Sequence, residues 1–232
     1  LKHKIDSPQS PTALYRPHPV FANIISSRDL LIFSCVLLAS SLCIGLRFAI
    51  TQSRWIWSIM SLGLIFAVFY TAIPQGFKYI ALGEPVVFLA FGPMMIEGAY
   101  TVQTSLLSWK ALFVSIPWGL LVALILLANN MRDAEFDEKC GIKTLSTALG
   151  RKSSLRLFNA LSLASFLLIF IYFLMGLLHW HVLMIFLSLP LAVRLNREFA
   201  ISVPKDADAK TSGFSFAFGI LLILSLLLDC AN

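Results

Sequence analysis

At residues 111–141 the chain reads ALFVSIPWGLLVALILLANNMRDAEFDEKCG. The first 18 residues are almost wholly apolar, and a run of that length is typical of a membrane-spanning helix. Directly after it, Asn129, Asp133 and Asp137 are spaced four apart, so on a helix they form one polar stripe. Four of the chain's twelve acidic residues fall within 133–138. The stretch therefore predicts a membrane helix that ends in a carboxylate-rich surface, and charge at that place requires a partner.

The composition extends this prediction to the whole chain. Of its 232 residues, 58% are hydrophobic and only 13% are charged, against about a quarter charged in a soluble domain. Apolar runs of helical length recur seven times, and we expect an all-α membrane protein, a multi-pass bundle with seven spans. The runs are Leu30–Leu46, Trp55–Ala72, Pro85–Val102, Ala111–Ala128, Leu157–Leu178, Val182–Val193 and Phe214–Leu228.

The sequence divides into a short polar segment and a membrane domain. Residues 1–29 are polar, contain four prolines and lack the early apolar region of a signal peptide. We expect them to form an N-terminal cytoplasmic segment, and residues 30–232 to form the transmembrane domain. The chain starts at Leu1 rather than Met, so a missing N-terminal portion is expected.

Basic residues orient the predicted spans. The net charge of +6 does not indicate nucleic-acid binding, because the basic residues are spread over the connections between apolar runs. If the connections alternate between the two sides, 15 of the 18 basic residues fall on one side, which the positive-inside rule makes cytoplasmic. That side holds the N-terminal segment and the connections 73–84, 129–156 and 194–212. The polar stripe and Lys78 are therefore predicted to face the cytoplasm together.

The stripe has the chemistry of a magnesium site. Mg²⁺ prefers oxygen ligands and is usually held by one or two carboxylates together with substrate phosphates. Asn129, Asp133 and Asp137 would supply the oxygens, and Arg132 and Lys143 would complement phosphate. Basic groups and Mg²⁺ at a membrane surface suit a diphosphate carried on a lipid tail. The alternative is a solvated helix end whose acidic and basic side chains pair with one another.

The longer context resembles a known family. The stretch 129–145 is similar to the second aspartate-rich motif of the UbiA superfamily of intramembrane prenyltransferases. Further stretches resemble its menaquinone branch, the 1,4-dihydroxy-2-naphthoate prenyltransferases and their animal relative that makes vitamin K2. These are residues 76–84 (GFKYIALGE), 91–93 (FGP) and 99–103 (AYTVQ), with residues 16–30 similar to the segment before the third helix of that branch.

The resemblance implies a fold and a reaction. Family members have nine transmembrane helices around a cavity, and two aspartate-rich motifs bind Mg²⁺ and a polyprenyl diphosphate. Ionisation gives an allylic cation that an aromatic quinone precursor attacks, with loss of the acceptor's carboxylate in the dihydroxynaphthoate enzymes. On this basis Asp133 and Asp137 are the expected catalytic residues, and Arg132, Lys78 and Lys143 the expected diphosphate ligands. For Lys78, a purely topogenic charge is the alternative.

One family feature is not found in the sequence. The first aspartate-rich motif lies between the family's first two helices, whereas the first apolar run here matches the third helix. We therefore expect a partial domain that lacks two helices, and Asp6 is a poor substitute for the missing motif. The alternative is a non-catalytic seven-span membrane protein, either a regulatory or partner-binding remnant or a transporter.

Other polar residues within the spans carry further expectations. Tyr70 and Tyr100 are predicted to line the cavity, where a hydroxyl and an aromatic face can stabilise a cation, with interfacial anchoring as the alternative. Glu97 lies in an apolar run and is a functional candidate by position alone. Asp208 is expected to be solvated in a charged loop. The pair Gly92-Pro93 is expected to kink its helix.

Overall fold

The computed structural model describes residue 11 and residues 19–20, 22–71 and 76–231. Within these ranges seven helical passes follow one another, as predicted, and five of them are long and apolar enough to cross a membrane. The elements are α3 (Ser27–Thr51), α4 (Arg54–Thr71), η1 (Phe77–Tyr79), α5 (Gly83–Leu89), η2 (Ala90–Met94), α6 (Met95–Thr104), α7 (Trp109–Lys139), α8 (Leu145–Leu174), η3 (Trp180–Ser188), α9 (Leu189–Ile201) and α10 (Ala207–Ala231).

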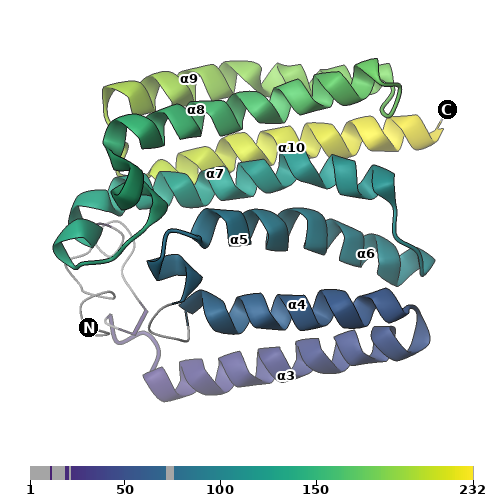
Figure 1. The fold of residues 1–232 in the computed structure, drawn as a ribbon, viewed down its shortest axis with the longest axis horizontal. Coiled ribbons are helices and arrows are strands. Elements are labelled where there is room, and N and C mark those ends of the chain that lie inside the picture. The colour runs from purple at the N-terminus through teal and green to yellow at the C-terminus, as the bar shows by residue number, and fades with distance from the viewer. Residues whose placement is uncertain (1–10, 12–18, 21, 72–75, 232) are drawn as a thin grey trace.

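Successive passes run antiparallel, side by side (Figure 1). The connections α4–α5, α7–α8 and α9–α10 consequently lie at one end of the bundle, and the connections α3–α4, α6–α7 and α8–η3 lie at the other. The connections therefore alternate between the two ends, as the count of basic residues assumed. The connections rich in lysine and arginine share one end. We call it the basic end. Its assignment to the cytoplasm stays a prediction.

The N-terminal boundary is only partly described. Helix α3 begins at Ser27, three residues before the predicted domain boundary, and Ser26 caps it by accepting a hydrogen bond from the Asp29 backbone N–H. Residues 1–10, 12–18 and 21 lie outside the described residues, and with them Asp6 and most of the predicted N-terminal segment. Residues 72–75, where the second apolar run ends, also lie outside them.

The polar stretch 129–156 is mostly helical rather than a loop. Helix α7 continues to Lys139, and Gly141 ends it with a positive φ of 70°, the left-handed conformation that favours glycine after a helix. Helix α8 then starts at a capping box formed by Thr144 and Thr147. It is interrupted once, at Gly150, where φ is 74°. The acidic stripe therefore lies within one continuous helix, α7.

The third pass is irregular where Gly92-Pro93 predicted a kink. Residues Ala90–Met94 form a π-helical turn between α5 and α6. A Cβ added to Gly92 would lie 2.8 Å from the Gly119 Cα of α7, closer than real Cβ contacts. Small residues let membrane helices approach in this way. Gly92 therefore packs this pass against α7 in addition to interrupting its regular helix.

Helix α7 is the centre of the bundle. Its Leu121, Leu124 and Leu127 are fully buried, and it packs against α8, α10 and the third pass. Helices α8 and α9 are joined by the stacked rings of Phe158 and Phe199, whose centroids are 4.3 Å apart. The polar residues that follow Leu127 therefore continue a helix that is held in place by packing on several sides.

Candidate functional site

The candidate site begins where α7 leaves the apolar part of the bundle. Its 31 residues extend about 46 Å at 1.5 Å per residue, more than the ~30 Å hydrocarbon core of a bilayer. Its last turns therefore project beyond that core at the basic end. Asn129, Asp133 and Asp137 lie on these turns, in one continuous helix. The predicted polar stripe is confirmed as a helical feature.

Arg132 joins the stripe to helix α10. Its Nε and Nη2 donate to the two carboxylate oxygens of Asp133 at 2.9 and 3.0 Å. Its Nη2 also donates to Asn129 Oδ1 at 2.6 Å, and its Nη1 donates to Asp208 Oδ1 at 2.8 Å. The Arg132 side chain is only 4% exposed. The expectation that Asp208 is solvated was wrong, because it forms an ion pair with a buried guanidinium.

Two connections meet beside the stripe. The Ala81 backbone N–H donates to the Lys143 carbonyl at 2.9 Å, and Ile80 and Lys143 form an isolated β-bridge. The segment that carries Lys78 is thereby tied to the α7–α8 turn. Lys78 lies 5.9 Å from the centre of the Tyr79 ring, and its charge interacts with that of Asp137. The structure therefore brings both predicted lysines to the end of the bundle that holds the stripe.

A buried polar pair lies below this surface. Asn130 Nδ2 donates to Glu84 Oε1 at 2.9 Å, and the two residues are 5% and 4% exposed. Glu84 Oε2 is buried and has no hydrogen-bond partner among the described residues. The Tyr70 hydroxyl lies beside the first residue of α5, since a Cβ added to Gly83 would be 3.6 Å from it, and it is close enough for the Glu84 charge to act on it. A carboxylate oxygen aimed into the protein interior is an available acceptor for a polar group.

The sequence reasoning did not identify Glu84, Asn130 or Asp208. Glu84 could have been found as the acid at the first turn of an apolar helix, directly before Pro85. Asn130 stands off the four-residue stripe, so the spacing did not select it. Nothing in the local sequence distinguishes Asp208 from the solvated acids around it. These three residues gain their significance from contacts between distant parts of the chain.

Tyr100 and Glu97, which the sequence singled out, lie away from the stripe. Tyr100 is on α6, about 24 Å along its pass from Glu84 at 1.5 Å per residue, and it is 37% exposed. The structure does not bring it to the stripe, and its contact with a substrate stays a prediction. Glu97 lies at the far end, where its Oε2 accepts a hydrogen bond from the Ser108 backbone N–H at 3.1 Å. That contact fixes the α6–α7 turn.

The oxygen atoms of the stripe fit Mg²⁺ if phosphate and water supply the remaining ligands. No cluster of three or more His, Cys, Asp or Glu side chains suitable for a metal occurs in the described part of the chain. Asp133 and Asp137 supply two carboxylates on adjacent turns, and their charges interact. Two carboxylates completed by phosphate oxygens and water are a usual Mg²⁺ arrangement. Arg132 shares the Asp133 oxygens, each of which has more than one lone pair to offer.

Comparison with known proteins shows the family of the chain. The sequence matches the UbiA prenyltransferase family over residues 5–223. UbiA prenyltransferase domain-containing protein 1 of Dictyostelium discoideum is 34% identical over 172 residues, which are 72% of this chain and 50% of the relative. The Drosophila melanogaster homolog of that protein is 36% identical over 151 residues (65% and 42%), and the Homo sapiens protein is 31% identical over 161 residues (68% and 46%).

These relatives define the family and leave the branch open. The chain spans about half the length of the curated relatives it matches. Their names specify a domain family and no acceptor, so the predicted dihydroxynaphthoate branch stays a prediction. The match covers the stripe, the Lys78 segment and every helical pass as far as residue 223. The chain belongs to the UbiA prenyltransferase family.

Proposed function

We propose that the protein takes part in the transfer of a polyprenyl group from its diphosphate to an aromatic quinone precursor, with Mg²⁺ as cofactor. The acceptor proposed is 1,4-dihydroxy-2-naphthoate or a close analogue, on the resemblance of the stretches 76–84 and 129–145 to the menaquinone branch. The observation that carries the proposal is the contact of the Lys78 segment with the α7–α8 turn, which directly follows the carboxylate stripe at one end of an apolar bundle.

We propose the following roles for the residues at the basic end. Lys78 and Lys143 supply positive charge for diphosphate oxygens where the helices leave the bilayer core. Arg132 was expected to bind diphosphate, but we assign it a positioning role, because its guanidinium pairs with Asp133 and joins that carboxylate to α10 through Asp208. Asp137 has neighbouring charges of both signs, Asp133 and Lys78. When bound between these carboxylates and the diphosphate, Mg²⁺ would neutralise part of the charge on the leaving group.

The proposed reaction is a substitution and needs no oxidant or reductant. The bond between the allylic C1 and the diphosphate oxygen breaks, and its electron pair leaves with the diphosphate. A ring carbon of the acceptor then forms a bond to C1. For dihydroxynaphthoate, the carbon that bears the carboxylate is attacked, carbon dioxide leaves, and the electron pair of the broken bond restores the aromatic ring.

A direct assay tests the proposal. Membranes from cells that express the full-length gene would receive dihydroxynaphthoate, labelled polyprenyl diphosphate and Mg²⁺, and prenylated product would be measured. We expect Asp133→Ala with Asp137→Ala to abolish product formation and chelation of Mg²⁺ to do the same. An unchanged rate in the double variant would show that the proposed metal site is wrong. A protein without turnover would instead support the non-catalytic alternative, which the pairing of Arg132 with its neighbouring carboxylates also suits.

A further inference from the structure

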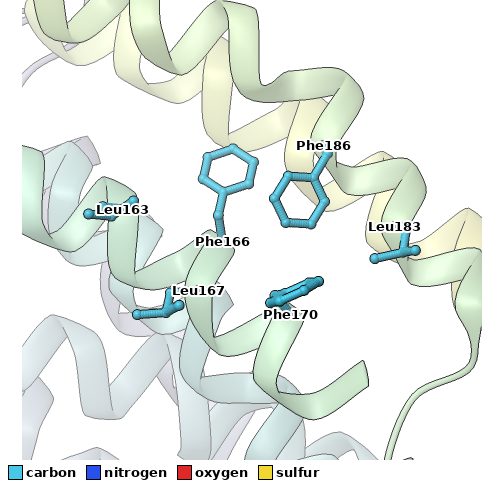
Figure 2. A pocket seen from close by; sticks show the side chains of 6 residues that line it. All are labelled: Leu163, Phe166, Leu167, Phe170, Leu183 and Phe186. Atoms are coloured by element: carbon cyan, nitrogen blue, oxygen red, sulfur yellow. The ribbon is translucent and has the colours of Figure 1, made fainter. Parts of the chain in front are cut away.

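An apolar groove opens on the outer side of the bundle, between α8 and η3 (Figure 2). It has a volume of about 470 Å³ and is lined by Leu163, Phe166, Leu167, Phe170, Leu183 and Phe186. Phe166 is 3% exposed and forms its floor, whereas Leu163 and Leu167 on the rim are 65% and 52% exposed. All six lining side chains are hydrocarbon, so the groove suits an aliphatic chain.

The groove continues toward the basic end. A second hollow shares Phe186 with the first and is lined further by five residues of α9: Leu189, Pro190, Val193, Arg194 and Arg197. From Leu183 to Arg197 the two hollows extend about 23 Å, taking 2.0 Å per residue in η3 and 1.5 Å in α9. One leaflet, half of a bilayer that measures about 40–45 Å with its headgroups, has the same depth. The combined groove therefore spans one leaflet.

Charge is confined to one end of this combined groove. Arg194 and Arg197 are exposed, and neither side chain has an ion pair among the described residues. The nearest acid in sequence, Glu198, pairs with Lys210 instead. A guanidinium binds a phosphate group through several donors at once. The groove thus offers hydrocarbon along its length and two available phosphate-binding groups at the headgroup level.

We propose that this combined groove binds one anionic phospholipid of the leaflet at the basic end. An acyl chain would lie over Phe166 and Phe186, and the phosphate would contact Arg194 and Arg197. The site lies on the outer face of α8 and α9, whereas the candidate functional site lies on α7 and the connections beside it. The inference is therefore independent of the proposed prenyl transfer, and binding can be measured without any activity.

A lipid-binding measurement on the full chain in mild detergent tests the proposal. Fluorescent phosphatidylglycerol and phosphatidylcholine with the same acyl chains would be titrated in parallel. We expect the wild type to bind phosphatidylglycerol more tightly. Arg194→Gln with Arg197→Gln is expected to weaken phosphatidylglycerol binding about tenfold or more, since each juxtamembrane cation contributes measurably to anionic-lipid binding. Phosphatidylcholine binding should not change.

A matched control separates a built site from general basicity. Lys152→Gln with Lys205→Gln removes the same charge from exposed positions near the same end, outside the groove lining. This pair should bind phosphatidylglycerol like the wild type. Leu163→Trp with Leu167→Trp, at exposed rim positions, should fill the apolar part and weaken both lipids. Equal loss in the control pair, no preference for phosphatidylglycerol in the wild type, or a dimer that occupies the groove and excludes lipid would overturn the proposal.

Discussion

Arg132 Nη1 lies 2.8 Å from Asp208 Oδ1, across 76 positions of sequence. The contact joins the end of α7 to the first turn of α10 and surrounds a guanidinium that is only 4% exposed. Asp133 holds the other side of the same guanidinium. The orientation of a predicted metal ligand therefore depends on a residue from the last helix.

The first prediction concerns Asp208. Asp208→Asn removes one of the two charges that compensate Arg132, and a hydrogen bond to a charged group contributes about 1.5–3 kcal/mol. We expect the free energy of unfolding to fall by about 1–3 kcal/mol and the thermal midpoint in detergent to drop. Asp206→Asn is the control, because Asp206 is 37% exposed and pairs with Lys210 at 3.3 Å, a surface contact of about 0–1 kcal/mol. Equal effects of the two variants would contradict the buried role of Asp208.

The second prediction uses two neighbouring asparagines in opposite environments. Asn130→Asp would place a second carboxylate where Asn130 now donates to Glu84 at 2.9 Å. Two buried carboxylates at that distance cannot both ionise without cost. We expect a loss of about 3–5 kcal/mol in unfolding free energy near neutral pH, the size seen for uncompensated buried charges. The loss should shrink as the pH falls, because protonation of one carboxyl restores a donor between them.

Asn129→Asp is the matched control for that change. The Asn129 oxygen already accepts a hydrogen bond from Arg132, so a carboxylate there keeps the acceptor and adds an attractive charge. Its thermal midpoint should equal or exceed that of the wild type at neutral pH. Thermal unfolding of both variants between pH 5 and 8 separates them. If Asn129→Asp were the more destabilising variant, the described arrangement of the two asparagines would be wrong.

The third prediction tests the contact between the third pass and α7. Gly92→Ala places a methyl group 2.8 Å from Gly119 Cα and 3.1 Å from the Ser115 carbonyl oxygen, which are backbone atoms that cannot rotate away. Overpacking of this kind costs about 1–3 kcal/mol. Gly98→Ala, in the same pass, meets only Ile59 Cγ2 at 3.5 Å, an ordinary contact. Thermal midpoints in detergent should fall for Gly92→Ala and stay within error for Gly98→Ala.

The sequence predicted the fold better than the site, because the helical passes depend on local hydrophobicity and the site depends on contacts between distant residues. Spans follow from local hydrophobicity, because each pass must be apolar over its whole length, and all seven runs occur as helical passes. The stripe at Asn129, Asp133 and Asp137 was equally predictable, since it depends on helical spacing alone. That spacing also required the helix to continue to Asp137, and α7 ends two residues later, at Lys139. Only tertiary contacts reveal that Asp208 compensates Arg132 or that Glu84 faces Asn130.

The fourth prediction tests whether the basic residues at the stripe bind diphosphate. Lys78 belongs to the segment that is hydrogen-bonded to the α7–α8 turn, and its charge interacts with that of Asp137. In the prenyl-transfer assay Lys78→Gln should raise the KM for polyprenyl diphosphate about tenfold, the loss expected for one charge-assisted contact. The KM for the aromatic acceptor should stay unchanged, because the lost contact is specific to phosphate.

Lys110→Gln is the control for Lys78, since Lys110 lies on the first turn of α7 at the opposite end of the bundle. It removes the same charge from the protein and should leave both KM values at the wild-type level. Inorganic diphosphate gives a second readout, as an inhibitor that competes for the same oxygen-binding groups. Its inhibition constant should rise in Lys78→Gln by the same factor as the KM. A rise in KM without a rise in that constant would assign Lys78 to loop positioning instead of diphosphate binding.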